Sequence, residues 1–136
     1  MSITERQKQL VRESFAKVTP ISEAAAEIFY GKLFEISPEV RRLFKGDLKK
    51  QGKMLMQTLS LAVKGLDNLP GLVPVLQKLA ERHIQYGVRE EDYTPVGNAL
   101  LLTLKAGLGD DFDQETRDAW IATYRLIAAT MKSHAY

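Results

Sequence analysis

Hydrophobic residues recur along the chain with the helical period of 3.6, and almost no segment alternates with the period of two that strands show. The apolar stripe over residues 10–18 predicts a first helix, and Ser2 and Glu5 have the spacing of a capping box at its start. Thr19-Pro20 ends this helix, because proline has no backbone N–H to continue it.

Cap and turn residues divide the remaining chain into further helices. Ser37-Pro38 predicts the start of a short helix that ends near Phe44, Lys45-Gly46-Asp47 reads as a loop, and Gly87 supplies a helix stop. Longer helices are predicted over about residues 22–36, 48–66, 72–86 and 92–108, and from about residue 113 onward. We therefore expect an all-α fold of roughly seven helices around one core, with residues 1–136 as a single domain.

Composition narrows the functional classes. A formal net charge of +2 is too small to indicate a nucleic-acid or membrane partner, and the lysines at positions 45, 49, 50 and 53 have no interleaved aromatic residue, as on a solvated helix face. The absence of cysteine excludes disulfides, thiol catalysis and cysteine metal sites. The first residues have no apolar core of a signal peptide, and residues 99–102 form the longest unbroken apolar run, so we expect a cytoplasmic protein.

His83 is one of two histidines in the chain, and it continues a helical stripe of Leu72, Leu76 and Leu79. A helix would direct its imidazole inward. A lone histidine on an apolar face is most often a hydrogen-bonded core residue, so this position by itself permits either a structural or a ligating role.

Four segments, in this order along the chain, resemble a known family in which the histidine is a ligand. They are IFYGKLF at residues 28–34, SPEVRRLF at 37–44, RHIQYGV at 82–88 and YTPVG at 93–97. Together with Trp120, this order resembles the globin family over essentially the whole chain. The likeness is to single-domain bacterial haemoglobins and to the haem domain of flavohaemoglobins.

The resemblance implies that His83 is the proximal ligand of haem b, which is iron protoporphyrin IX. Neutral imidazole suits haem iron, and the Leu79 carbonyl is the expected acceptor for the other ring nitrogen. His134 lies near the end of the sequence and is a weak competitor. Arg82 either reaches a haem propionate or is a solvated charge.

Further haem-pocket residues follow from the same resemblance. Phe44 matches the aromatic residue that packs flat on the porphyrin. The other expected pocket positions are Leu43, Met54, Val88, Tyr93, Val96 and Tyr124.

On the distal side the resemblance places Tyr30 and Gln51 beside the open iron position, with Leu55 one turn beyond Gln51. A tyrosine hydroxyl and a glutamine amide can both donate hydrogen bonds to oxygen, which becomes partly negative on ferrous haem. Carbon monoxide gains less from such donors. Two alternatives stay open: Gln51 turned toward solvent, and a Tyr30 hydroxyl bonded elsewhere.

One feature departs from flavohaemoglobins, in which the proximal histidine is linked to a tyrosine and a late glutamate. Tyr93 matches the tyrosine, but the glutamate position falls at about Ala135, and no acid follows Asp118. We therefore expect the histidine to donate electron density to the iron only weakly. Weak donation favours stable oxygen binding over cleavage of the oxygen–oxygen bond. The sequence also contains no nucleotide-binding motif, so iron reduction is expected from a separate reductase.

Three functions are therefore considered. The first is a haem globin that binds oxygen reversibly for storage, transport or scavenging, with nitric oxide and carbon monoxide as further ligands. The second is a nitric-oxide dioxygenase that depends on a separate reductase, and the third is a haem-free globin-fold interaction or sensor module. Either a monomer or a homodimer is compatible with the sequence.

Overall fold

The all-α prediction is confirmed by a computed structural model that describes residues 3–44 and 46–136. Six α-helices and five short 3₁₀ helices account for most of this part of the chain, which contains no strand. The α-helices are α1 (Glu5–Val18), α2 (Ser22–Ile36), α3 (Leu48–Lys64), α4 (Leu69–Tyr86), α5 (Tyr93–Leu108) and α6 (Gln114–Ala135). The 3₁₀ helices are η1 (Thr19–Ile21), η2 (Pro38–Leu43), η3 (Gly65–Asp67), η4 (Glu90–Asp92) and η5 (Gly109–Asp111).

Two boundaries differ from the sequence prediction. The segment after Pro38 is the 3₁₀ helix η2, so the described chain has six α-helices rather than seven. Helix α4 begins at Leu69, because the Asn68 side chain caps it by accepting from the Gly71 N–H and Pro70 fits its first turn.

The cap of α1 also differs in its residues. Ser2 lies outside the described residues, and Thr4 is the N-cap. Its hydroxyl accepts from the Gln7 N–H at 3.0 Å, while the Gln7 side chain accepts from the Thr4 N–H at 3.1 Å. The reciprocal pair is a capping box that satisfies two orphan donors of the helix start. Lys45, in the predicted loop, lies outside the described residues as well.

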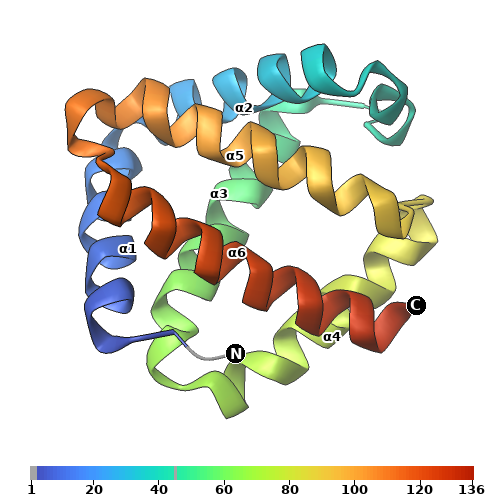
Figure 1. Ribbon diagram of the computed structural model, residues 1–136. Coiled ribbons are helices and arrows are strands. Elements are labelled where there is room, and N and C mark those ends of the chain that lie inside the picture. Colours follow the sequence, from blue (N-terminus) through green and yellow to red (C-terminus); the bar gives the residue numbers. More distant parts are fainter. Residues whose placement is uncertain (1–2, 45) are drawn as a thin grey trace.

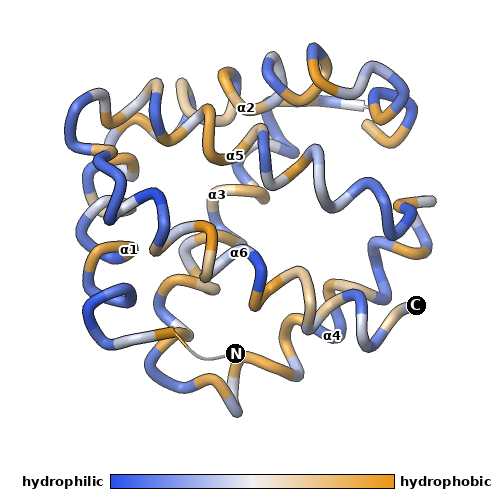
Figure 2. The backbone as a smooth tube through the Cα atoms, in the orientation of Figure 1, coloured by the Kyte–Doolittle hydropathy of each residue, from blue (hydrophilic) through white to orange (hydrophobic). Residues whose placement is uncertain are grey.

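The helices cross in layers around the core (Figure 1). Helix α2 packs on α5 and α3, whereas α6 packs on α4 and α1. Hydrophobic and hydrophilic stretches alternate within each helix, as expected for helices with one buried face (Figure 2). None of the described helices is both long and apolar enough to cross a membrane.

The core consists of two clusters of buried side chains. The larger contains Trp120, whose indole N–H donates to the buried Ser14 hydroxyl at 2.8 Å. The smaller lies where α4, the start of α5 and the end of α6 meet, and it includes Leu72, Leu76 and Tyr93. Tyr124 packs against both clusters, so it marks their junction.

Candidate functional site

The end of α4 fixes the position of His83. Gly87 adopts a left-handed conformation with φ +92°, which residues with a side chain rarely adopt. The Val88 N–H then donates to the His83 carbonyl at 2.9 Å, and the Gly87 N–H donates to that of Ile84 at 3.0 Å. These bonds satisfy carbonyls of the last turn, so the helix ends in a defined geometry one turn after His83.

The His83 imidazole is half-buried and neutral. Its Nδ1 lies 2.8 Å from the Leu79 carbonyl oxygen, which confirms the predicted partner. Since a carbonyl only accepts, Nδ1 carries the proton and Nε2 keeps its lone pair. Burial lowers the His83 pKa and the Leu79 bond opposes this effect. The Leu79 carbonyl lies inside the helix, because α4 continues to Tyr86.

Tyr93 forms a wall beside the histidine. Its ring lies 6.3 Å from the His83 ring, with 30° between their planes. The Tyr93 hydroxyl is buried without a hydrogen-bond partner of normal geometry in the described chain, and burial raises its pKa. Its backbone carbonyl accepts from the Tyr124 hydroxyl at 2.6 Å, which ties the start of α5 to α6.

Gly97 allows Tyr124 to lie against α5. A Cβ at this position would stand 2.6 Å from Tyr124 Cε2 and 2.9 Å from Cδ2, both closer than real contacts. The Tyr124 ring therefore occupies the space that any other residue at 97 would fill. This role of Gly97 was not visible in the sequence, where only its place in a segment that resembles globins was apparent.

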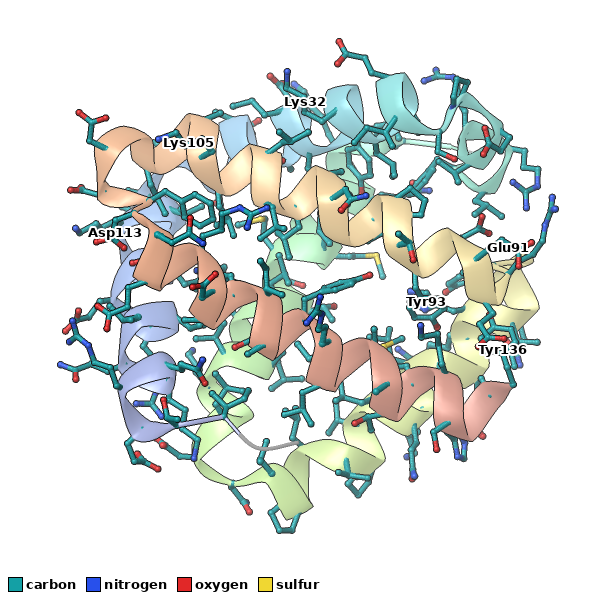
Figure 3. The ribbon with its side chains drawn as sticks, in the orientation of Figure 1. Lys32, Glu91, Tyr93, Lys105, Asp113 and Tyr136 are labelled. Atoms are coloured by element: carbon teal, nitrogen blue, oxygen red, sulfur yellow. The ribbon has the colours of Figure 1, made fainter. Side chains whose placement is uncertain are left out.

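Tyr136 completes the same region. Its hydroxyl donates to the Val88 carbonyl at 2.5 Å, and its ring meets the Tyr93 ring edge to face at 6.1 Å. Figure 3 shows Tyr93 and Tyr136 close together at one end of α5 and α6, with Lys105 and Asp113 at the other. Sequence reasoning missed Tyr136 because it looked for an acid near this position, whereas a neutral hydroxyl lies there.

On the other side of the candidate pocket, Tyr30 lies buried in α2. Its ring packs edge to face on Phe44 at 5.1 Å and stacks on Phe34 at 6.1 Å. Burial raises the Tyr30 pKa to about 12, so its hydroxyl is protonated at neutral pH. No residue of the described chain hydrogen-bonds this hydroxyl, a result that does not support the alternative of a Tyr30 bonded elsewhere.

Gln51 lies in the first turn of α3, which Asp47 caps by accepting from the Lys49 N–H. The Gln51 side-chain oxygen is buried, so the side chain is turned into the protein rather than toward solvent. The adjacent Gly52 lets α3 approach α2 closely, because a Cβ there would stand 2.8 Å from the Cβ of Ala26. This close crossing brings the helix of Gln51 against the helix of Tyr30.

An ion pair joins η2 to η4, the short helix that precedes α5. Asp92 is buried, accepts from the Arg89 N–H at 2.8 Å and lies 3.7 Å from an Arg42 nitrogen of η2. Leu43, next along the chain from Arg42, packs near Gly87. Thus η2, which precedes Phe44, is held beside the end of the helix that carries His83. The Arg42–Asp92 contact could not be found from sequence spacing.

The remaining predicted residues divide by exposure. Six are half-buried, namely Leu43, Phe44, Leu55, Val88, Val96 and Tyr124. The Met54 side chain is 54% exposed, and Arg82 is exposed without an ion pair among the residues that the structure describes. His134 is exposed and lies 3.9 Å from a Glu81 carboxylate oxygen.

The described chain contains no group of three or more His, Cys, Asp or Glu side chains that could hold a metal ion. A surface groove of about 530 Å³ lies between the second half of α5 and the start of α6, lined in part by Leu102, Lys105 and Arg117. None of the predicted site residues lines this groove.

The residues around His83 fit a flat, largely apolar group such as haem. A neutral imidazole with a free Nε2 lone pair is the form that binds haem iron, and the orientation of its ring is fixed by Leu79. Aromatic and aliphatic side chains supply apolar walls, and the Tyr30 hydroxyl offers a donor that no residue of the described chain uses.

The comparisons with known proteins agree with this description. The family model for globins matches residues 27–131. A flavohemoprotein of Halalkalibacterium halodurans is 29% identical over 93% of this chain, but the match covers 32% of that protein. A flavohemoprotein of Bordetella parapertussis is 32% identical over 89% of this chain and 31% of its own length. The chain thus spans about one third of these relatives.

Two further relatives match over nearly their full length. Neuroglobin of Chaenocephalus aceratus is 27% identical, and the match covers 95% of this chain and 90% of that protein. The solved structure of an engineered carbene transferase, RmaNOD of Rhodothermus marinus, carries the provisional description nitric oxide dioxygenase. It superimposes with a TM-score of 0.88 at 27% identity, over 98% of this chain and 94% of that one. The chain belongs to the globin family.

Proposed function

We propose that this globin binds haem b through His83 and binds oxygen reversibly on the opposite side of the haem. The observation that supports oxygen as the ligand is the Tyr30 hydroxyl, which is protonated, belongs to a buried side chain packed on Phe44, and is not hydrogen-bonded by the described chain. A donor that no described residue uses suits a ligand that accepts a hydrogen bond.

Each side chain has a distinct task in this proposal. Haem, when bound, supplies an iron atom with one open coordination position for a diatomic gas. His83 offers Nε2 to the iron, and the Leu79 carbonyl keeps the proton on Nδ1 so that the ring does not change tautomer. Phe44 and Leu55 exclude water from the distal side, which strengthens hydrogen bonds made there.

Tyr30 and Gln51 provide ligand selectivity. The phenol O–H and the carboxamide N–H both donate, so they favour oxygen, which carries more negative charge than carbon monoxide in this setting. Gln51 is uncharged at every accessible pH and is a poor iron ligand, so it leaves the distal position open. We therefore expect a five-coordinate ferrous protein that takes up oxygen rapidly and releases it slowly.

A second function is favoured by the relatives. Flavohemoproteins are similar to this chain in sequence, and the provisional nitric oxide dioxygenase of R. marinus has the same fold, which supports dioxygenation of nitric oxide to nitrate with a separate reductase. The proximal geometry favours reversible binding instead, because Nδ1 of His83 bonds a neutral carbonyl rather than a carboxylate. A haem-free interaction or sensor module is the third candidate.

One experiment separates these functions. Purified protein with haem is mixed with oxygen, and its equilibrium binding, release rate and nitric oxide consumption are measured with and without an added flavin reductase. We expect reversible oxygenation over many cycles and little sustained nitric oxide consumption. Sustained turnover that stops when the reductase is withheld would favour the dioxygenase, and failure to bind haem would favour the third candidate.

A further inference from the structure

The charge of this chain is strongly asymmetric. Residues 41–64, which include η2 and α3, contain seven Lys or Arg residues and one Asp, a formal charge of +6. The remaining residues contain 12 Lys or Arg and 16 Asp or Glu, a formal charge of −4. The small net charge of the whole chain therefore conceals a basic segment, and this segment contains Phe44 and Gln51, two residues of the candidate site.

Three lysines at the start of α3 account for much of this positive charge. Lys49, Lys50 and Lys53 are exposed, and in the part of the chain that the structure describes none of them has a carboxylate within ion-pair distance. The one nearby acid, Asp47, uses its side chain to cap the helix. By contrast, four cations of α1 are paired, each with a Glu or an Asp.

The position of these lysines opposes the local electrostatics of the helix. The start of an α-helix is its positive end, where acids are favourable and cations are not. Helices α1, α2 and α6 each have a glutamate in their first turn, whereas α3, like α4 and α5, has none there, and it is α3 that has lysines in this turn. Residues that break a local rule without a local gain are found most often where function requires them.

The same turns of α3 also contain the distal glutamine. Gln51 lies between Lys50 and Lys53 in sequence, and its side-chain oxygen is buried while the lysines face solvent. Several exposed lysines without acidic partners have the charge of a small, electrostatically steered contact surface, the kind that redox partners use.

We propose that Lys49, Lys50 and Lys53 form the docking surface for an acidic electron-transfer flavoprotein that reduces the haem iron. This inference rests on the proposed function, since it requires bound haem. Each electron that leaves the reduced flavin converts one ferric haem to the ferrous form. A compact acidic protein can contact the basic start of α3 alone, whereas an extended polyanion or a membrane would also meet the acidic remainder of the chain.

The test compares two reductants of ferric protein by stopped-flow absorbance. Reduced flavodoxin is the acidic protein donor, and reduced riboflavin is an uncharged donor with the same ring. We expect the rate with flavodoxin to fall roughly tenfold between about 0.02 and 0.3 M salt, and the rate with riboflavin to change little. In the triple variant Lys49→Glu, Lys50→Glu, Lys53→Glu, the rate of reduction by flavodoxin at low salt should fall at least about tenfold. The rate of reduction by riboflavin should not fall.

A matched control carries the same change of charge elsewhere. The variant Lys78→Glu, Arg117→Glu, Arg125→Glu should keep most of the rate and the salt dependence. Glutamates at the start of α3 are favourable for the helix, so the first variant is expected to fold, which circular dichroism checks. Amide chemical shifts of the three lysines on adding oxidised flavodoxin give a readout that needs no electron transfer.

The outcomes are distinct. A protein without a Soret band would contradict the proposed function itself. Normal haem binding with equal losses in both triple variants, or with no loss in the first, would overturn the docking surface alone. Lysine-dependent sedimentation with anionic phospholipid vesicles, without any effect on reduction, would assign the surface to a membrane and also overturn the proposal.

Discussion

At the scale of single residues, the candidate site depends on two side chains whose hydrogen bonds differ. His83 has its Nδ1 occupied by Leu79, whereas no described residue bonds the Tyr30 hydroxyl. The first arrangement prepares a ligand for a metal, and the second leaves a donor for whatever enters the pocket. The chemistry of the site therefore follows from which polar atoms the protein satisfies itself.

Replacing Tyr30 by phenylalanine tests the donor. The Tyr30→Phe variant keeps the ring packing on Phe34 and Phe44 and removes only the hydroxyl. We expect oxygen release about tenfold faster, the loss of roughly 1.4 kcal/mol of ligand stabilisation, with carbon monoxide release much less affected. Laser photolysis and ligand displacement measure both rates, and Tyr86→Phe, at an exposed tyrosine, is the control. Equal acceleration for both gases would contradict a hydrogen-bond role.

The pH dependence of the stability of the haem-free protein tests whether the His83 pKa is lowered. Burial lowers its pKa below the ordinary value of 6.5, so the unfolded chain binds a proton more readily than the folded chain. Neutral His83 therefore contributes fully to the stability of the folded state above pH 6.5. This stabilisation is lost as the pH falls through the lower pKa of the folded state.

Urea unfolding of the haem-free protein between about pH 5 and 7 measures this effect. The free energy of unfolding should fall toward acid by at most about 1.4 kcal/mol per pH unit from this one proton. The His83→Gln variant should flatten the slope, whereas His134→Gln, at an exposed histidine, should keep it. A slope that persists in His83→Gln would show that other groups cause it.

At the scale of helices, two glycines set the distances on which the site depends. Gly52 permits α3 to approach α2, and Gly97 permits the Tyr124 ring to lie against α5. Tyr124 in turn donates to the Tyr93 carbonyl, so the spacing of α5 and α6 controls the wall beside His83. Small residues at helix crossings thus act on the site from a distance.

Substitution of Gly97 by alanine should be costly. The added methyl group would force the half-buried Tyr124 ring away and break its bond to Tyr93, a destabilisation of about 1–3 kcal/mol in urea unfolding. Gly31→Ala, where nothing lies within 4 Å of the new atom, should instead stabilise by up to about 1 kcal/mol. The double variant Gly97→Ala, Tyr124→Leu should recover part of the loss. Similar stabilities for the two single variants would argue against the close contact at Gly97.

The sequence predicted most of the helices because their apolar stripes and caps are local signals. It placed the end of α4 correctly, since Gly87 is a local stop, and it identified the Leu79 carbonyl, since a bond four residues apart lies within one helix. It did not distinguish the 3₁₀ geometry of η2 from an α-helix, because both begin with the same Ser37-Pro38 signal.

Sequence patterns did not predict the contacts between segments that are distant in the chain. The Arg42–Asp92 pair, the Tyr136 bond to Val88 and the fit of Tyr124 against Gly97 each join residues from different helices or loops. No periodicity encodes them, because they depend on how the helices cross. The resemblance to globins gave the assignment of residues to the distal and proximal sides of the haem. The periodicity of apolar residues by itself indicated only that His83 was a candidate ligand.

At the scale of the whole molecule, two asymmetries coincide. The core divides into two clusters that meet at Tyr124, and the charge divides into a basic segment around α3 and an acidic remainder. The haem is proposed to bind between His83 and Tyr30, on the side where the basic helix α3 carries Gln51. Cofactor binding and partner attraction are thus proposed for neighbouring parts of one scaffold.

The most direct measurement is the visible absorption spectrum of the purified protein and its His83→Ala variant, each with added haem. For the original protein we expect a Soret band, a five-coordinate spectrum after dithionite reduction, and conversion to a stable oxygenated form. The variant should lose these features and regain a five-coordinate spectrum with free imidazole. A Soret spectrum that is unchanged by His83→Ala, or a six-coordinate ferrous spectrum without added ligand, would contradict His83 as the proximal ligand of an open haem.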